Sequence, residues 1–219
     1  MHFRLPFRDR TEAGQVLAQH VIASVSDENP LVLALPRGGV PVGFEIAQAL
    51  HAELDIFIVR KLGLPGREEL AIGAIASGGV RVLNHDLIRE LHLSDELITR
   101  VSVREQQELE RREQLYRENR TPIPVEGRTV VLVDDGLATG ASMMAGARAL
   151  RPRNPSRIVV AVPVSAPETC RRFQTEVDQI ICAATPEPFG AVGEWYSDFS
   201  QTSDQEVRKL LELSRRLDH

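Results

Sequence analysis

The sequence predicts an α/β protein built on a central, mostly parallel sheet flanked by helices. Five short apolar runs, rich in valine and isoleucine, have the pattern of strands that are buried on both faces. Segments with apolar residues at helical spacing lie between these runs, and such alternation is typical of βαβ units. The chain has 219 residues and is 42% hydrophobic, which is enough for a sizeable core in one domain.

The elements follow in order along the chain. The predicted strands are residues 31–35, 54–59, 129–133, 157–164 and 177–183, with helical spacing at 42–50 and 143–150. A hairpin is expected at Ala71–Leu83, because Ser77-Gly78-Gly79 divides two apolar strips. A long charged helix begins after the cap Ser94 and ends before Pro122, and a last helix covers about 203–217. We therefore expect a single domain over 1–219, with an insertion at about 71–120 and a distinct tail at about 185–219.

Composition argues against several partners. The net charge is -5 and only 5% of the residues are aromatic, so no nucleic-acid surface is expected. The interval 104–120 holds five arginines and five glutamates, which favours a solvated helix over a basic face. No apolar run suits a signal or a membrane span, so we expect a cytoplasmic protein without membrane contact. Cys170 and Cys182 are expected to be free thiols, with a disulfide or redox pair as the less favoured alternative.

A strand that ends in two acids carries the strongest functional signal. Asp134 and Asp135 follow the apolar residues 130–133, and a helix begins near Ser142. Backbone N–H groups of a small-residue loop at a helix N-terminus bind phosphate, and paired carboxylates suit the neighbouring hydroxyls of a ribose. A P-loop ATPase is excluded, because the loop has no lysine. A surface turn in which the acids only cap the next helix is the alternative. The predicted ribose-phosphate site comprises Asp134, Asp135, Gly136, Leu137, Ala138, Thr139, Gly140, Ala141 and Ser142.

Two further strand ends carry basic residues. Arg37, Gly38 and Gly39 lie between the first strand and its helix, and the planar guanidinium suits phosphate oxygens. Arg60 and Lys61 end the second predicted strand, at the edge where open α/β sheets bind ligands. An ordinary turn and a solvated basic pair are the alternatives. Together these residues predict a second phosphate-binding region beside the first.

The segment 130–142 resembles the phosphoribosyl pyrophosphate signature of type I phosphoribosyltransferases, and the chain is similar to bacterial members of undefined substrate. The resemblance implies the type I phosphoribosyltransferase fold, in which a small additional segment, the hood, forms the pocket for the base. In this chain the tail at about 185–219 is expected to form the hood. It assigns the ribose hydroxyls to Asp134 and Asp135 and the 5-phosphate to residues 136–141. The Arg37 turn is similar to the family's pyrophosphate loop, where a non-proline cis peptide is common.

The resemblance extends to the Arg60-Lys61 pair, and the chain departs from the family pattern at two positions of the loop. Arg60-Lys61 matches the pair that flanks a mobile catalytic loop, so residues 63–71 are expected to form a lid that excludes water. Glu68 and Glu69 in it are expected to be solvated acids rather than a catalytic base. Gly136 stands where most members carry a larger residue. Ala138 replaces the aspartate with which hypoxanthine-type enzymes contact the purine, so their proton transfer is not supported here.

The reaction that the resemblance implies is displacement of pyrophosphate from the anomeric carbon by a nitrogenous base. Arg37, Lys61 and a Mg²⁺ carried by the ligand, without direct protein ligands, would stabilise the pyrophosphate, while Asp134 and Asp135 fix the ribose. A base could lie against the 71–83 hairpin or stack on Trp195 or Tyr196; alternatively these aromatic residues hold the tail to the core. A homodimer stays open. A sensor that binds without turnover, or a phosphoribosyl hydrolase, is the alternative function.

Overall fold

A parallel sheet of five strands forms the centre of the fold, which we describe from a computed structural model. The description covers residues 3–26, 29–118 and 120–217, apart from the side chains of residues 68, 69 and 217. The strand order is β2-β1-β6-β7-β8. The strands are β1 (Leu31–Ala34), β2 (Glu53–Ile56), β6 (Thr129–Val133), β7 (Arg157–Val164) and β8 (Gln179–Ala184).

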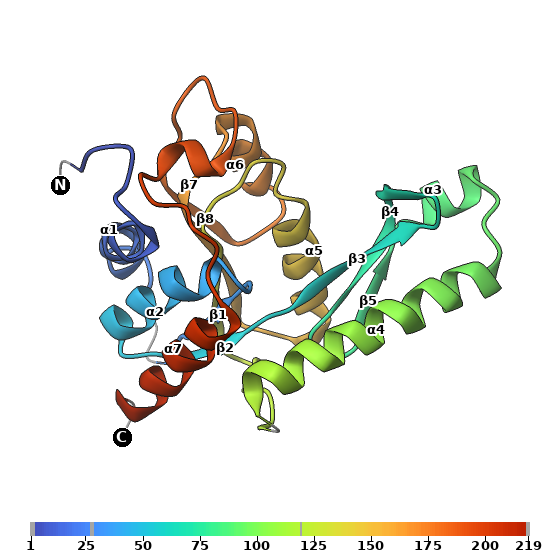
Figure 1. Cartoon of the computed structure of the whole chain (residues 1–219), viewed down its shortest axis with the longest axis horizontal. Coiled ribbons are helices and arrows are strands. Elements are labelled where there is room, and N and C mark those ends of the chain that lie inside the picture. The colour runs from blue at the N-terminus through green and yellow to red at the C-terminus, as the bar shows by residue number, and fades with distance from the viewer. Residues whose placement is uncertain (1–2, 27–28, 119, 218–219) are drawn as a thin grey trace.

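Both faces of this sheet are buried. In β6, Val131 and Val133 pack into one core while Val130 and Leu132 pack into the other, because successive side chains of a strand point to opposite faces. The first core includes residues of α1 (Arg10–Ile22), α2 (Gly39–Leu50) and α7 (Asp204–Leu217), and the second includes residues of α5 (Ala141–Leu150) and α6 (Pro167–Phe173). Helices therefore cover the sheet on two sides (Figure 1). Burial on both faces accounts for the continuous apolar runs, and the bounds predicted for β6 and β7 are confirmed. Two short 3₁₀ turns complete the elements, Arg151–Arg153 and Val192–Trp195.

A second, antiparallel sheet extends to one side of the first (Figure 1). It consists of β3 (Val59–Leu64), β4 (Arg67–Ala76) and β5 (Val80–Leu83), and is followed by α3 (His85–Glu90) and α4 (Asp95–Arg117). The expected hairpin at 71–83 is confirmed as β4 and β5, with Gly78 and Gly79 at positive φ in the turn. Ser94 caps α4 as predicted, since its hydroxyl accepts a hydrogen bond from the N–H of Leu97.

The strand expected at 54–59 is wrong in one respect, because the chain changes sheets within it. β2 ends at Ile56, and the N–H of Phe57 still donates to Ala34 of β1 at 2.9 Å. The N–H of Ile58, however, donates to the hydroxyl of Ser77, also at 2.9 Å. The pairing partners come from distant parts of the sequence, and a continuous apolar run does not show where one partner replaces the other.

The segment 63–71, expected to form a lid, has the structure of a β-hairpin, and its action as a lid stays a prediction. β3 and β4 form a hairpin in which Gly63 pairs with Ala71 and Leu64 with Arg67. The tight turn is possible because Gly66 has a φ of 79°. The side chains of Glu68 and Glu69 lie outside the described part of the chain, so their expected role stays a prediction.

A buried ion pair fastens α4 to the central sheet. The guanidinium of Arg117 donates to both carboxylate oxygens of Asp55, at 3.1 and 3.2 Å, and to the carbonyl of Ile56 at 2.8 Å. Arg117 and Asp55 are each only 3% exposed. Since α4 is strongly charged along its length, it is no membrane segment, and no helix in the described ranges is long and apolar enough to be one.

The expectation of two free thiols is wrong. Cys170 of α6 and Cys182 of β8 are joined in a disulfide, with their Cα atoms 6.8 Å apart. The two residues are only 12 positions apart, but it is the packing of α6 against β8 that places the sulfurs together, and the spacing alone did not show this. The disulfide ties α6 to the sheet.

Candidate functional site

The candidate site lies where β1 and β6 end side by side. Ala34 pairs with Val133, and the N–H of Leu35 donates to the carbonyl of Val133 at 2.9 Å. The turn that follows β1 and the acids that follow β6 therefore meet at the carboxyl edge of the sheet, the usual ligand-binding edge of parallel α/β folds. This neighbourhood brings the two main sequence predictions into one place.

Glycine is required where the two segments touch. A Cβ on Gly38 would lie 2.1 Å from Oδ2 of Asp135, and a Cβ on Gly39 would lie 2.7 Å from the carbonyl oxygen of Val133. Either distance is too short for a real side chain, so only glycine lets the Arg37 turn approach the acids. The peptide bond between Pro36 and Arg37 is cis, as the resemblance to a pyrophosphate loop led us to expect.

Asp134 and Asp135 are half-buried and differ in their partners. Asp134 accepts a hydrogen bond from the N–H of Asp135 at 2.9 Å, whereas Asp135 forms an ion pair with Nε of Arg10 at 2.8 Å. Burial raises the pKa of Asp134 well above its usual range, and the neighbouring charge of Asp135 raises it further. Burial also raises the pKa of Asp135, although the guanidinium of Arg10 offsets part of the effect. Ionising both acids in this buried position therefore costs free energy. A ligand whose hydroxyls donate hydrogen bonds to the carboxylates would reduce that cost.

We expect Asp134→Asn to raise the thermal stability at pH 8. A carboxyl whose pKa is raised in the folded state lowers stability when it is ionised, and this loss disappears as the pH falls below the unfolded pKa. The neutral amide removes the loss while its oxygen can still accept from the N–H of Asp135. For a chain of this size, the melting temperature should rise by about 2–4 °C for each kcal/mol relieved.

Thermal melts at pH 8 and pH 5 measure this effect, and the advantage of the variant should shrink at the lower pH. Asp198→Asn is the matched control, because hydrogen bonds from Ser200 lower the pKa of that exposed carboxyl. The control should not gain stability. A melting temperature for Asp134→Asn at or below that of the wild type at pH 8 would contradict the assignment of a penalised carboxylate.

The loop between β6 and α5 ends at a weakly capped helix N-terminus. Gly140, the N-cap, has a φ of 68° and no side chain, and the hydroxyl of Thr139 accepts a long hydrogen bond from the N–H of Ala141, at 3.5 Å. Ala138 and Thr139 are exposed to solvent. Two residues of α6 hold the loop in place: the hydroxyl of Thr169 donates to the carbonyl of Ala138 at 2.5 Å, and the guanidinium of Arg172 donates to the carbonyl of Thr139. An anion is well placed at such a helix start.

Two loop residues have other roles than the expected phosphate contact. The side chain of Leu137 is buried, its N–H donates to Val164 and its carbonyl accepts from Ala166, so this residue anchors the loop instead. Gly136 is small for a structural reason, because a Cβ there would lie 2.5 Å from Cγ1 of Val192 in the tail. The departure at Gly136 therefore reflects close packing of the tail against the loop.

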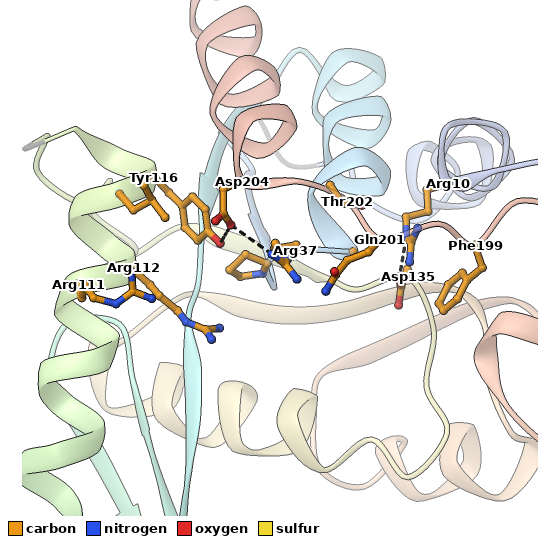
Figure 2. A pocket seen from close by; sticks show the side chains of 13 residues that line it. Arg10, Arg37, Arg111, Arg112, Tyr116, Asp135, Phe199, Gln201, Thr202 and Asp204 are labelled. Atoms are coloured by element: carbon orange, nitrogen blue, oxygen red, sulfur yellow. Dashed lines mark hydrogen bonds and ion pairs between the residues drawn. The ribbon is translucent and has the colours of Figure 1, made fainter.

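A cavity of about 530 Å³ opens in front of the Arg37 turn and Asp135 (Figure 2). Arg37 reaches into it and lies 3.5 Å from Oδ1 of Asp204, the first residue of α7. The same carboxylate accepts the hydroxyl of Tyr116 at 2.6 Å, and these hydrogen bonds and charges lower the pKa of Asp204. The lining residues are Arg10, Pro36, Arg37, Gly38, Arg111, Arg112, Leu115, Tyr116, Asp135, Phe199, Gln201, Thr202 and Asp204.

The basic pair at the start of β3 does not join this cavity. Arg60 donates through Nε and Nη2 to Glu105 of α4, at 2.9 and 2.5 Å, and so holds that helix against β3. This pairing corrects the expected phosphate contact of Arg60. Lys61 is exposed and lines a second cavity, of about 710 Å³, together with Thr139 and Ala141 of the loop. The 71–83 hairpin also contributes to this second cavity, through Ala71, Gly73, Ala74, Val82 and Leu83.

The aromatic residues of the tail pack inward. Tyr196 is 6% exposed, its ring lies against Phe7, and its hydroxyl donates to the backbone carbonyl of Asp135 at 2.6 Å. The expected base stacking on Tyr196 is therefore wrong, because the ring is covered. Trp195 stacks on Phe189 and lines neither of the two cavities. The alternative, in which the aromatic residues hold the tail to the core, accounts for both.

Sequence reasoning did not single out four charged residues that line the 530 Å³ cavity, Arg10, Arg111, Arg112 and Asp204. Each comes from a helix remote from the two motifs, and the ion pair of Arg10 spans 125 positions. Residues 104–120 carry equal numbers of arginines and glutamates, so the composition gave no indication that Arg111 and Arg112 line a cavity. The only local signal was the position of Arg10 at the start of a helix beside other arginines.

Comparison with known proteins places the chain in a family. Residues 62–185 match the phosphoribosyl transferase domain. A Mycobacterium tuberculosis protein, found in two strains and provisionally named a phosphoribosyl transferase, is 46% identical over 210 residues. The match covers 96% of this chain and 47% of the relative, so the chain spans about half the length of these curated relatives. The chain belongs to the phosphoribosyl transferase domain family.

Solved structures agree with this placement. The crystal structure of TT1426 from Thermus thermophilus is 42% identical and superimposes with a TM-score of 0.85, covering 94% of this chain and 98% of that one. The AQ2163 protein of Aquifex aeolicus is 14% identical with a TM-score of 0.51, covering 84% and 78%, and shares the fold alone. The α/β fold with a parallel central sheet is thus common to these proteins.

Proposed function

We propose that the chain binds phosphoribosyl pyrophosphate and transfers its phosphoribosyl group to a nitrogenous base. The proposal is supported chiefly by the contact between the Arg37 turn and Asp135, which brings a phosphate-binding cation and a ribose-binding acid to one cavity. In this proposal the 5-phosphate binds at the weakly capped start of α5, the ribose hydroxyls donate to Asp134 and Asp135, and the pyrophosphate lies beside Arg37.

The proposed chemistry needs no protein nucleophile. As the bond from the anomeric carbon to pyrophosphate breaks, positive charge develops on the ribose and negative charge on the leaving group. Asp134 and Asp135 would favour the first charge and Arg37 the second. The lone pair of the base nitrogen then bonds to the anomeric carbon, pyrophosphate departs with the electrons of the broken C–O bond, and the proton of that nitrogen passes to water or to the pyrophosphate.

Magnesium enters the proposal with the substrate. Among the described residues, no group of three or more His, Cys, Asp or Glu side chains could hold a metal ion. A Mg²⁺ that keeps its waters and binds phosphate oxygens needs only one or two carboxylates, and Asp135 and Asp204 line the cavity. When bound there, the ion would supply positive charge that stabilises the leaving pyrophosphate.

The test is to incubate the protein with phosphoribosyl pyrophosphate, Mg²⁺ and a panel of purine and pyrimidine bases, and to measure released pyrophosphate. We expect release that depends on one class of base. Release without a base would indicate a hydrolase, and binding without release would indicate a sensor on the same fold. Either outcome would contradict the transferase proposal, and an absence of binding at millimolar ligand would contradict all three functions.

A further inference from the structure

We propose that Arg111 and Arg112 of α4 complete the pyrophosphate end of the site, an inference that rests on the proposed function. Both residues line the 530 Å³ cavity, as Arg37 and Gly38 of the turn after β1 also do. Figure 2 shows Arg112 extending from α4 toward the space beside Arg37. The charged helix, which has no assigned role in the chemistry, would thereby supply part of the binding surface.

The charge of the cavity favours an anion with more than one phosphate group. Among the described residues, four arginines line it, Arg10, Arg37, Arg111 and Arg112, whereas the only carboxylates are Asp135 and Asp204. Both carboxylates already have partners, since Asp135 binds Arg10 and Asp204 binds Tyr116 and Arg37. Two arginines on α4 therefore face the cavity without an acid opposite them among its lining residues.

Glu108 holds the two α4 arginines so that donors remain available. It accepts from Nε of Arg112 at 2.8 Å, and from Nε and Nη2 of Arg111 at 2.7 and 3.0 Å. Hydrogen bonds from both arginines lower the pKa of Glu108 to about 2, so it stays ionised as their partner. Nη1 and Nη2 of Arg112 and Nη1 of Arg111 bind no other acceptor in the part of the chain that the structure describes. A pair of guanidinium groups with free terminal N–H groups suits the oxygens of a pyrophosphate.

The position of α4 is fixed by contacts other than these arginines. Arg117 is buried against Asp55, and Arg60 of β3 binds Glu105, so the helix is held at two points along its length. The side chains of Arg111 and Arg112 are 62% and 36% exposed to solvent, so neither is packed in the core. Their replacement should therefore leave the fold intact and affect the ligand.

The test compares two ligands on Arg111→Gln/Arg112→Gln and on the wild type. Phosphoribosyl pyrophosphate carries both phosphate ends, and ribose 5-phosphate lacks the pyrophosphate. We expect the double variant to bind phosphoribosyl pyrophosphate at least about tenfold more weakly, with the affinity for ribose 5-phosphate changed by less than about twofold. Arg100→Gln/Arg104→Gln replaces two exposed arginines of the same helix that do not line the cavity; this charge-matched control should bind both ligands like the wild type.

The outcomes separate this inference from the proposed function. If the wild type binds phosphoribosyl pyrophosphate and the double variant binds it equally well, the α4 arginines form only a solvated face and the inference is overturned. An equal loss of both ligands would overturn it as well, because the effect would not be confined to the pyrophosphate. If the wild type itself binds neither ligand, the proposed function fails with it.

Discussion

Replacing both acids, Asp134→Asn with Asp135→Asn, is expected to reduce the affinity for ribose 5-phosphate at least about 100-fold, because two charge-assisted hydrogen bonds are lost. In the proposed complex the carboxylates accept hydrogen bonds from the ribose hydroxyls, whereas each amide that replaces them carries one acceptor oxygen and one donor NH₂ group and no charge. Titration calorimetry of the folded variant measures the change. The fold should be retained, since neither acid belongs to the buried cores.

A second ligand makes this experiment specific to the hydroxyls. The wild type should bind ribose 5-phosphate more tightly than 2-deoxyribose 5-phosphate, and the double variant should lose this preference. Both sugars carry the same phosphate, so a defect in the phosphate loop would weaken them equally. Unchanged affinity of the variant for ribose 5-phosphate would refute the assignment of Asp134 and Asp135 to the ribose.

The largest expected loss of stability follows from Arg117→Leu. The substitution leaves the buried carboxylate of Asp55 without its cationic partner, although the N–H groups of Ile56 and Ile123 still donate to it, and it frees the carbonyl of Ile56. Breaking a buried pair in this way typically costs about 3–5 kcal/mol. At about 2–4 °C per kcal/mol for a chain of this size, the melting temperature should fall by roughly 10 °C. Denaturant unfolding followed by circular dichroism gives the free energy directly.

Two further variants test the cause of that loss. Asp55→Leu together with Arg117→Leu should recover part of the stability, because no unpaired charge remains buried. Arg216→Leu removes an exposed ion pair with Glu212 on α7 and should change stability by no more than about 1 kcal/mol. A loss for Arg117→Leu that is as small as that of Arg216→Leu would show that α4 is not anchored through Asp55.

The elements that sequence reasoning located well are those with local causes. β6 and β7 are largely apolar runs rich in valine and buried on both faces, and the cap of α4 at Ser94 is a contact three residues away. The change of sheets after Ile56 was missed because it depends on Ala34 and Ser77, whose distance along the chain conceals their proximity. The disulfide was missed for the same reason.

The candidate site divides in a similar way. Asp134, Asp135 and the Arg37 turn were predictable, because each motif directly follows an apolar strand and adjacent parallel strands end at the same edge. Arg10, Asp204 and the α4 arginines could not be predicted, since only the packing of whole helices brings them to the cavity. Tyr196 shows the converse limit: its aromatic character suggested a ligand contact, and its burial is visible only in three dimensions.

A crystal structure of the protein with a nucleoside 5′-monophosphate bound tests the central claim most directly, because this ligand carries the ribose phosphate and a base together. The account predicts that the 5′-phosphate lies against the backbone of residues 138–141 at the start of α5, with the ribose hydroxyls on Asp134 and Asp135. The base would then mark the acceptor pocket. A ribose phosphate bound away from these acids, or its absence at millimolar nucleotide, would contradict the account.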